Sequence, residues 1–360
     1  MDKIKFGLVG CGRIGSRHVY EISKNKNCKL TAVCDTDKEK ADKIGEKYHA
    51  KSVYVLRDIF NEDIDILNIC TPSGLHAEMT IAGLKNNVHV LCEKPMALSL
   101  KEADAIILAE KESKKKLFIV KQNRYNPPVK VLKDFVYKKK LGKIILINSN
   151  VLWNRNEDYY RESYWRGTMK LDGGALMTQC SHFIDLMIWV GGKVKTVFAN
   201  MSNMSHPNIE TEDTGIIILG FENGSIGSLQ YTTSTYGKNM EGSITVLGTK
   251  GSIKVGGEYI NKLEFWNVEG EKKPKLDPGK GANDYGTYKG SMSNHDKVIE
   301  NVVDVLMNNA EIATNSLRGR ESVEVMQACY ISSKKKIQVS LPLKGEDYAF
   351  KINEEKGWFK

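Results

Sequence analysis

Long apolar runs are missing from this sequence of 360 residues. No stretch approaches the roughly 18 apolar residues that a membrane-spanning helix needs, so we expect no membrane association. The first residues lead into a predicted strand without the apolar core of a secretory signal, which favours a cytoplasmic protein. With 41% hydrophobic and 27% charged residues and no internal repeat, the chain is predicted to be soluble and globular. Its length favours two domains.

Paired cysteines are also missing. The 7 cysteines are odd in number and scattered, and they form no CxxC pair. Most lie inside apolar stretches, which predicts small reduced core residues and no metal site. They are Cys11, Cys28, Cys34, Cys70, Cys92, Cys180 and Cys329.

Acidic residues are outnumbered, and the formal net charge is +9. The excess lies in lysine clusters at 114–116, 138–140 and 334–336, where solvated helix faces and turns are predicted. No recognition motif accompanies them, so we expect no nucleic acid partner. A basic balance is compatible with a small polyanionic substrate.

A glycine-rich turn follows the first predicted strand, Lys3–Val9. Its sequence is Gly10-Cys11-Gly12-Arg13-Ile14-Gly15, and a helix is predicted to begin near Ile14. In this pattern the first glycine allows a tight turn and the second lets backbone N–H groups reach a pyrophosphate. The third permits close helix–strand packing. The turn predicts a dinucleotide site.

An acidic residue closes the second predicted strand, Leu30–Asp35, 20 residues after Gly15. The Asp35 carboxylate would accept hydrogen bonds from the ribose hydroxyls of NAD and repel the additional phosphate of NADP. The next residue is Thr36, not an arginine. NAD is therefore the predicted cofactor.

Two patterns divide the chain near residue 125. Before it, strands that are apolar throughout alternate with amphipathic helices, which predicts a doubly wound parallel sheet over residues 1–125. The predicted strands are Ile66–Cys70, Val88–Cys92 and Leu117–Val120, and the helices are His76–Lys85 and Leu100–Lys115.

Residues 126–360 are predicted to form a second α/β domain with a mainly antiparallel sheet, because apolar and polar residues alternate along its strands. Helices are predicted over Val129–Lys140, Gly174–Val190, His295–Asn308 and Arg318–Lys334. The last has apolar positions that we expect to pack back on the first domain, and we expect a cleft between the domains. The predicted strands are Ile144–Trp153, Gly215–Phe221, Ser225–Thr232, Ser243–Leu247, Ser252–Val255 and Lys262–Trp266.

Lys94 is the first candidate catalytic residue. It belongs to Glu93-Lys94-Pro95, directly after a strand that should end at the ligand-binding edge of the sheet. A lysine beside an oxidised nicotinamide would have a lowered pKa and could act as an acid or base near neutrality. The alternative is an ordinary exposed loop lysine.

His182 is the second candidate. Thr178, His182 and Asp185 are spaced to share one face of a regular helix. A histidine beside a hydroxyl and a carboxylate is a workable proton-transfer group. A lone histidine on a helix is more often a core or surface residue, so this face supports a function only together with Lys94.

Taken together, these motifs and the segment Thr71-Pro72-Ser73-Gly74-Leu75-His76 resemble the glucose-fructose oxidoreductase/inositol dehydrogenase/MocA (Gfo/Idh/MocA) family. The resemblance implies a Rossmann domain, then an α/β domain with a large open sheet that often assembles dimers or tetramers. It implies oxidation of a sugar or cyclitol by NAD(P), with Lys94 and His182 in the active site. Thr71, Pro72 and His76 match the loop along the cofactor, and Glu93 and Lys94 match its nicotinamide end.

Thr178 departs from the pattern of many members, which carry aspartate four residues before the histidine. A hydroxyl cannot hold an imidazolium as a carboxylate does. Either Lys94 takes more of the proton transfer, or His182 mainly orients the sugar hydroxyl. This weakens the inositol dehydrogenase interpretation.

Three further segments are similar to the bacterial UDP-N-acetylglucosaminuronate 3-dehydrogenases of surface-polysaccharide synthesis. They are 122–127 (QNRYNP), 165–168 (WRGT) and 173–179 (GGALMTQ). That resemblance implies oxidation of the sugar C3 hydroxyl, with NAD reoxidised in place by 2-oxoglutarate. The alternatives are an inositol-type or other sugar dehydrogenase, or a catalytically silent NAD-binding sensor.

Arginines and aromatic residues gather near the predicted domain junction and before the helix of His182. Guanidinium groups could hold a uronate carboxylate or a diphosphate, and aromatic rings could stack on a uracil or sugar face. These residues are Arg124, Arg155, Arg161, Arg166, Trp153, Tyr159, Tyr160 and Trp165. The predicted cofactor contacts are Gly10, Gly12, Arg13, Ile14, Gly15, Asp35, Thr71, Pro72, His76, Glu93, Lys94, Gln122, Trp165 and Arg166. The predicted substrate contacts are Lys94, Arg124, Tyr125, Arg155, Tyr159, Thr178 and His182. We also expect a homodimer or homotetramer.

Overall fold

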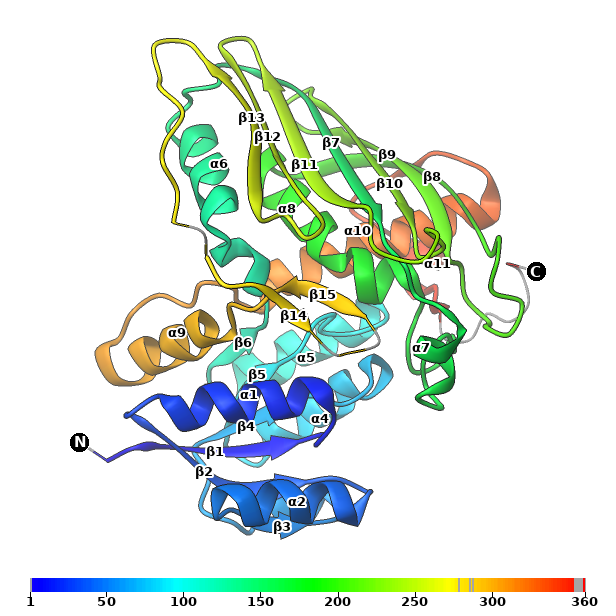
Figure 1. The fold of residues 1–360 in the computed structure, drawn as a ribbon. Coiled ribbons are helices and arrows are strands. Elements are labelled where there is room, and N and C mark those ends of the chain that lie inside the picture. Colours follow the sequence, from blue (N-terminus) through cyan, green and yellow to red (C-terminus); the bar gives the residue numbers. More distant parts are fainter. Residues whose placement is uncertain (1, 278, 285, 287, 353–358, 360) are drawn as a thin grey trace. The chain divides into compact units, whose positions relative to one another are not determined.

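The computed structural model describes residues 2–277, 279–284, 286, 288–352 and 359. The chain divides into two compact units (Figure 1). The first comprises Met1–Lys121 and His295–Arg320, and the second comprises Gln122–Asn294 and Glu321–Lys360. The chain therefore leaves the first unit at Lys121 and returns to it for a segment near the C-terminus.

A parallel sheet of six strands forms the core of the first unit, in the order β3-β2-β1-β4-β5-β6. The order reverses between β1 and β4, and ligands bind outside the carboxyl ends of the strands at such a point. Both faces are buried, as the fully buried residues of β4 show. The strands are β1 (Ile4–Val9), β2 (Cys28–Cys34), β3 (Lys51–Val53), β4 (Ile66–Ile69), β5 (His89–Cys92) and β6 (Leu117–Ile119). This confirms the predicted doubly wound sheet.

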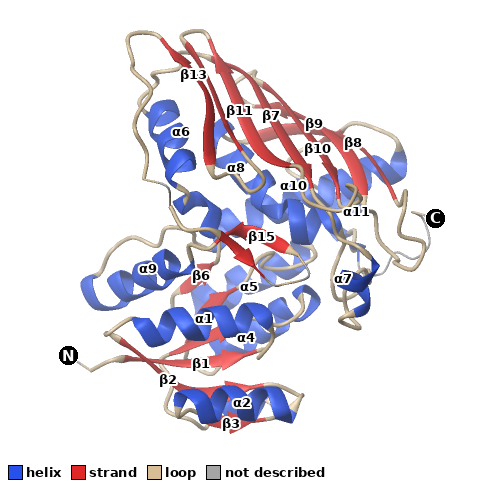
Figure 2. Ribbon diagram, viewed as in Figure 1, coloured by secondary structure: helices blue, strands red, loops and turns tan. Residues whose placement is uncertain are grey.

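Helices connect these strands (Figure 2). Crossovers between parallel strands are right-handed, so the reversal of strand order places the helices on both faces of the sheet. Helix α1 packs against α9, and α4 packs against α5. The helices are α1 (Arg13–Lys24), α2 (Lys38–Tyr48), α3 (Leu56–Ile59), α4 (His76–Lys85), α5 (Leu100–Ser113) and α9 (His295–Asn308).

An eight-stranded sheet dominates the second unit, in the order β13-β12-β11-β7-β10-β9-β8-β16. Neighbouring strands are antiparallel except β7 and β10, which are parallel, so the predicted mainly antiparallel sheet is confirmed. The strands are β7 (Ile144–Leu152), β8 (Val194–Ser202), β9 (Thr214–Phe221), β10 (Ile226–Thr232), β11 (Glu241–Gly248), β12 (Gly251–Gly256), β13 (Lys262–Val268) and β16 (Val339–Ser340). A small hairpin adds β14 (Ala282–Asp284) and β15 (Lys289–Met292).

Helices α6, α8 and α10 of the second unit pack on one face of this sheet (Figure 2). Helix α6 contacts β12 and α8 contacts β7. Serines of α10 accept hydrogen bonds from the backbone of β8, at Ala199 and Met201. The helices are α6 (Pro127–Tyr137), α7 (Glu157–Arg161), α8 (Ser181–Gly191), α10 (Ser316–Lys335, which begins in the first unit) and α11 (Gly345–Ala349).

All seven cysteines are free and buried, as the sequence predicts. The helix search over the described residues found none that is both long and apolar enough to cross a membrane.

Candidate active site

The glycine turn after β1 has the stereochemistry that the sequence predicts. Gly10 has φ +94°, and a Cβ there would lie 2.6 Å from backbone atoms of Cys70. A Cβ on Gly15 would lie 2.0 Å from the carbonyl oxygen of Gly10. A Cβ on Gly12 would meet no atom within 4 Å. Gly10 and Gly15 are therefore needed because a side chain at either position would clash with the backbone. Gly12 instead leaves open space at the start of α1, where a pyrophosphate fits.

Asp35 is tied to this turn. Its Oδ2 accepts a hydrogen bond from the Cys11 N–H at 2.7 Å, and its Oδ1 accepts one from the Asp37 N–H at 2.9 Å. The carboxylate is half-buried, and each oxygen has a second lone pair for a ribose hydroxyl. The turn and the carboxylate together fit NAD.

His76 links two loops at the carboxyl edge of the parallel sheet. Its ring nitrogens lie 2.7 Å from the carbonyl oxygen of Pro95 and 2.9 Å from that of Thr71. Burial lowers the pKa of His76, so near pH 7 the neutral ring donates to one carbonyl at a time. The structure thus shows His76 holding the loops together, while the predicted cofactor contacts of Thr71, Pro72 and His76 stay predictions.

Lys94 lies where the sequence predicts, just after β5, and it is half-buried. Its neighbour Glu93 is buried, and Glu93 Oε1 lies 2.9 Å from Nε2 of His18 on α1. Oε2 of Glu93 accepts a hydrogen bond from the Lys94 N–H at 3.1 Å. The Glu93 side chain is therefore engaged with protein groups, a role that the sequence did not reveal.

In the second unit, the segment that carries His182 is not the regular helix predicted over Gly174–Val190. Leu176–Cys180 form a π-helical turn, and α8 begins at Ser181. The π turn changes the spacing of side chains between Thr178 and His182, and such turns are frequent at functional sites.

The three residues predicted to share a helix face have different partners. Thr178 Oγ1 donates to the Gly174 carbonyl oxygen at 2.9 Å. Nε2 of His182 lies 3.5 Å from the amide Nε2 of Gln122, which also donates to Ser291 Oγ at 2.9 Å. Asp185 forms an ion pair with Arg124, described next. The structure thus brings His182 together with Gln122.

Arg124 and Asp185 form a buried bidentate pair. Nε and Nη2 of Arg124 each donate to one carboxylate oxygen of Asp185 at 2.8 Å. The guanidinium also lies over the ring of Trp189, with Cζ 5.0 Å from the ring centroid. The fork that we expected to hold a uronate carboxylate is engaged by a carboxylate of α8. Tyr125, the residue after Arg124, is half-buried.

Arg155 is almost fully buried, with 1% of its surface exposed. Its Nη1 donates to Asn239 Oδ1 at 3.2 Å, and its Nη2 donates to Gln179 Oε1 at 2.9 Å. The guanidinium lies over the ring of Tyr288, with Cζ 4.7 Å from the ring centroid. Burial lowers the pKa of Arg155, and aromatic faces and amide oxygens stabilise its charge.

Tyr159 and Arg166 join the same cluster. Cζ of Arg166 lies 4.1 Å from the centroid of the Tyr159 ring, and Nη1 donates to the Tyr159 carbonyl oxygen at 2.7 Å. The Tyr159 hydroxyl accepts from Gln179 Nε2 at 3.0 Å. The structure therefore brings together three predicted contacts, Arg155, Tyr159 and Arg166. Trp165 is half-buried beside them, whereas Arg161 is exposed and pairs with Glu157.

A buried glutamate that the sequence analysis did not single out anchors the start of the His182 segment. Oε1 of Glu212 accepts from the Leu176 N–H at 2.7 Å and lies 2.9 Å from the Tyr330 hydroxyl. A Cβ on Gly174, which has φ +107°, would lie 2.2 Å from Glu212 Oε2. Burial raises the pKa of Glu212 to about 8. The adjacent letters Glu212-Asp213 at the start of a strand are a weak signal for such a group.

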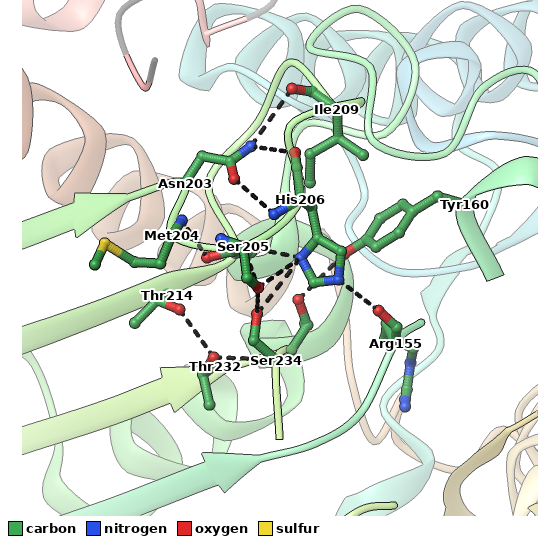
Figure 3. A network of polar contacts seen from close by, with 12 residues as sticks. Arg155, Tyr160, Asn203, Met204, Ser205, His206, Ile209, Thr214, Thr232 and Ser234 are labelled. Atoms are coloured by element: carbon green, nitrogen blue, oxygen red, sulfur yellow. Dashed lines mark hydrogen bonds and ion pairs between the residues drawn. The ribbon is translucent and has the colours of Figure 1, made fainter. Parts of the chain in front are cut away.

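His206 and Asp213 form a second polar network beside Arg155 (Figure 3). Nδ1 of His206 lies 2.8 Å from Asp213 Oδ2, and Nε2 lies 2.8 Å from the Arg155 carbonyl oxygen. Hydroxyls of Ser205 and Ser234 lie at 3.5 and 3.4 Å from Nδ1. A serine nucleophile would need the nitrogen opposite the aspartate, and the Arg155 carbonyl takes that position. The network therefore fixes the backbone of Arg155.

Two family models match the chain. The model described as "Oxidoreductase family, NAD-binding Rossmann fold" matches residues 4–121, and "GFO/IDH/MocA C-terminal domain" matches residues 129–254.

Solved relatives extend the match to nearly the whole chain. The WlbA dehydrogenase from Bordetella pertussis, crystallised with NADH and UDP-GlcNAcA, is 34% identical with a TM-score of 0.88 over 95% of this chain and 99% of that one. The WlbA dehydrogenase from Chromobacterium violaceum, crystallised with the same molecules, is 36% identical with a TM-score of 0.86 over 96% and 98%. Myo-inositol 2-dehydrogenase from Thermotoga maritima is 28% identical over 69% of this chain and 74% of its own length. This chain belongs to the Gfo/Idh/MocA family and is an NAD-dependent dehydrogenase.

Proposed function

We propose that this enzyme oxidises the C3 hydroxyl of UDP-N-acetylglucosaminuronate to a ketone. The observation that carries the proposal is the likeness, over nearly the full length of each chain, to two dehydrogenases crystallised with NADH and UDP-GlcNAcA. The guanidinium groups of Arg155 and Arg166 add positive charge to the second unit, which favours an anionic ligand.

In the proposed reaction, the neutral amine of Lys94 takes the proton of the C3 hydroxyl, and His182 assists this transfer. NAD, when bound, supplies the nicotinamide that accepts the hydride. Lys94 suits the role because it follows β5 at the carboxyl edge of the sheet, where this fold binds its ligands. The hydroxyl of Thr178 donates to the Gly174 carbonyl, so Thr178 supplies no carboxylate to His182.

The substrate can be tested directly. The purified enzyme is incubated with UDP-N-acetylglucosaminuronate, NAD and 2-oxoglutarate, and the products are followed by mass spectrometry. We expect a UDP sugar lighter by two hydrogens and an equal amount of 2-hydroxyglutarate. If neither forms while myo-inositol gives NADH, the substrate proposal is wrong.

An inositol-type dehydrogenase is the second candidate, and the likeness to the Thermotoga maritima enzyme favours it. Thr178 speaks against it, because the inositol dehydrogenase pattern has a carboxylate at that position. A catalytically silent sensor would bind NAD and turn over neither substrate.

We also propose a homodimer or homotetramer assembled through the outer face of the eight-stranded sheet. Ile216 and Ile218 are 55% and 47% exposed, whereas Ile217 and Leu219 between and beyond them are buried. Phe198 and Ile226 on the neighbouring strands are exposed as well. An apolar patch of this kind favours a protein partner. Light scattering of the wild type and of Ile218→Lys would test the assembly, since a charge there should yield smaller species.

A further inference from the structure

Three titratable side chains meet in the interior of the first unit, next to Lys94. Glu93, His18 and His295 are all buried. Oε1 of Glu93 lies 2.9 Å from Nε2 of His18 and 3.7 Å from Nε2 of His295. The two imidazole rings meet edge to face, with centroids 5.0 Å apart. The end of β5 is thereby joined to α1, which follows the glycine turn, and to the first residue of α9.

This arrangement keeps Glu93 ionised. Burial opposes ionisation, but the hydrogen bond from His18 and the nearby imidazole of His295 outweigh it and hold the pKa of Glu93 well below its ordinary value. Burial lowers the pKa of His295, so that ring favours its neutral form. A buried carboxylate without such donors would be strongly destabilising.

The second oxygen of the same carboxylate acts on the neighbouring residue. Oε2 accepts the N–H of Lys94 at 3.1 Å, and the N–H of Glu93 donates to the carbonyl oxygen of Ile69 on β4 at 3.0 Å. The peptide between Glu93 and Lys94 is therefore held from both sides, by the sheet and by the carboxylate. A held peptide restricts the directions in which the Lys94 side chain can leave the backbone.

We propose that Glu93 is a positioning residue, locked by His18 and His295, and that this lock sets the backbone and hence the amine of Lys94. The inference rests on the role proposed for Lys94 above. It gives Glu93 a function different from the cofactor contact expected from the sequence. It requires neither histidine to touch substrate or cofactor.

The central test compares two substitutions of His18. His18→Leu removes the donor at similar size, whereas the side-chain amide of His18→Gln can still donate to Glu93. His89→Leu is the matched control. His89 is the first residue of β5, at the opposite end of the strand from Glu93, and its Nδ1 accepts a hydrogen bond from the Lys116 N–H. Urea unfolding and NAD binding establish that each variant is folded.

The main readout is the amine of Lys94 itself, without substrate. Reductive methylation with ¹³C-formaldehyde labels lysines, and the labelling rate and titration of Lys94 are followed by mass spectrometry and NMR. In His18→Leu, we expect the labelling rate and the titration of Lys94 to become more like those of exposed lysines. In His18→Gln and His89→Leu, we expect both to remain near the wild-type values. With an active substrate, kcat should fall about 10- to 100-fold in His18→Leu, the effect of a misplaced catalytic group. The KM should change little.

Glu93→Leu provides a second route if His18→Leu does not fold. Leucine is of similar size and has no acceptor oxygen, so the bond from His18 and the bond to the Lys94 N–H are both lost, and Lys94 should change as in His18→Leu. Unchanged labelling and titration of Lys94 in folded His18→Leu and Glu93→Leu would overturn the proposal.

A bound metal would overturn it as well. The three ligand atoms lie within 4.8 Å of one another, close enough for one cation to bridge them. A stoichiometric metal in the wild type that is lost from His18→Leu would make the group a metal site. Because the labelling needs no substrate, a failure of this inference is distinguishable from a wrong sugar.

Discussion

Arg124 donates from Nε and Nη2 to the two carboxylate oxygens of Asp185, each at 2.8 Å, and joins residues 61 positions apart in the sequence. The pair is nearly inaccessible to water, with side-chain exposures of 9% and 3%. It fixes α8, which carries His182, to the short helical turn that carries Gln122. The distance between His182 and Gln122 therefore depends on this pair.

Breaking the pair from one side should be strongly destabilising. Arg124→Met leaves Asp185 as a buried charge without its guanidinium partner, and we expect the free energy of unfolding to fall by about 3–5 kcal/mol. Urea unfolding measures it. Lys138→Met, which removes an exposed ion pair with Asp134, should cost less than about 1 kcal/mol. Equal losses in the two variants would show that Asp185 without Arg124 carries no additional cost from its burial.

Two glycines of the dinucleotide turn should respond differently to alanine. Gly15→Ala places a methyl group 2.0 Å from the Gly10 carbonyl oxygen, so we expect a lower Tm without any ligand. Gly12→Ala meets no atom within 4 Å and should leave that Tm unchanged, but its methyl group would occupy the space that the pyrophosphate needs. Thermal unfolding with and without NAD checks both. A full NAD-induced rise of Tm in Gly12→Ala would contradict the assignment.

Lys94→Ala removes the proposed base. We expect kcat to fall by about 10²- to 10⁴-fold, the usual contribution of a positioned acid or base, while NAD still raises the Tm. Lys101→Ala, an exposed lysine on α5, serves as the control and should keep wild-type kcat. Full turnover by a Lys94→Ala protein that binds NAD would remove Lys94 from the reaction.

Glu212 should make stability depend on pH. Its pKa is about 8 when folded, against 4.5 as the ordinary value, so between these values the folded state binds the additional proton. Stability should therefore fall as pH rises from about 5 to 8, by a few kcal/mol. Glu212→Gln keeps the size and cannot ionise, so this part of the decline should disappear.

Urea unfolding of wild type and Glu212→Gln at several pH values measures this difference. Above pH 8, Glu212→Gln should be the more stable protein. Parallel stability curves across the range would show that folding does not raise the pKa of Glu212.

Local patterns predicted much of the fold. Helices α4 and α9 have the bounds that the sequence predicts, His76–Lys85 and His295–Asn308, because turn residues and apolar periodicity delimit them. Strand β8, Val194–Ser202, was not predicted. Its polar residues Lys195, Thr196 and Asn200 weaken the alternation of apolar and polar residues that identifies a strand. The strand is recognised only from its pairing with β9 and β16.

Functional side chains were predicted unevenly. The glycine turn, Asp35 and Lys94 follow from spacing alone, because each lies at a strand end whose position the chain itself defines. The helix of His182 was predicted as regular, whereas the structure contains a π turn at Leu176–Cys180. Its start is held by Glu212, whose closeness to Gly174 has no counterpart in local sequence.

The sequence by itself determined the doubly wound parallel sheet, the dinucleotide turn and the preference for NAD, since these depend on residues near one another along the chain. Only the tertiary structure decided which groups are the partners of the buried charges. Arg124 is joined to Asp185 across 61 positions, His18 to Glu93 across 75, and Leu176 to Glu212 across 36. A buried charge needs a partner that the fold brings close to it, often from a distant part of the chain. Composition and periodicity describe only local sequence and do not identify that partner.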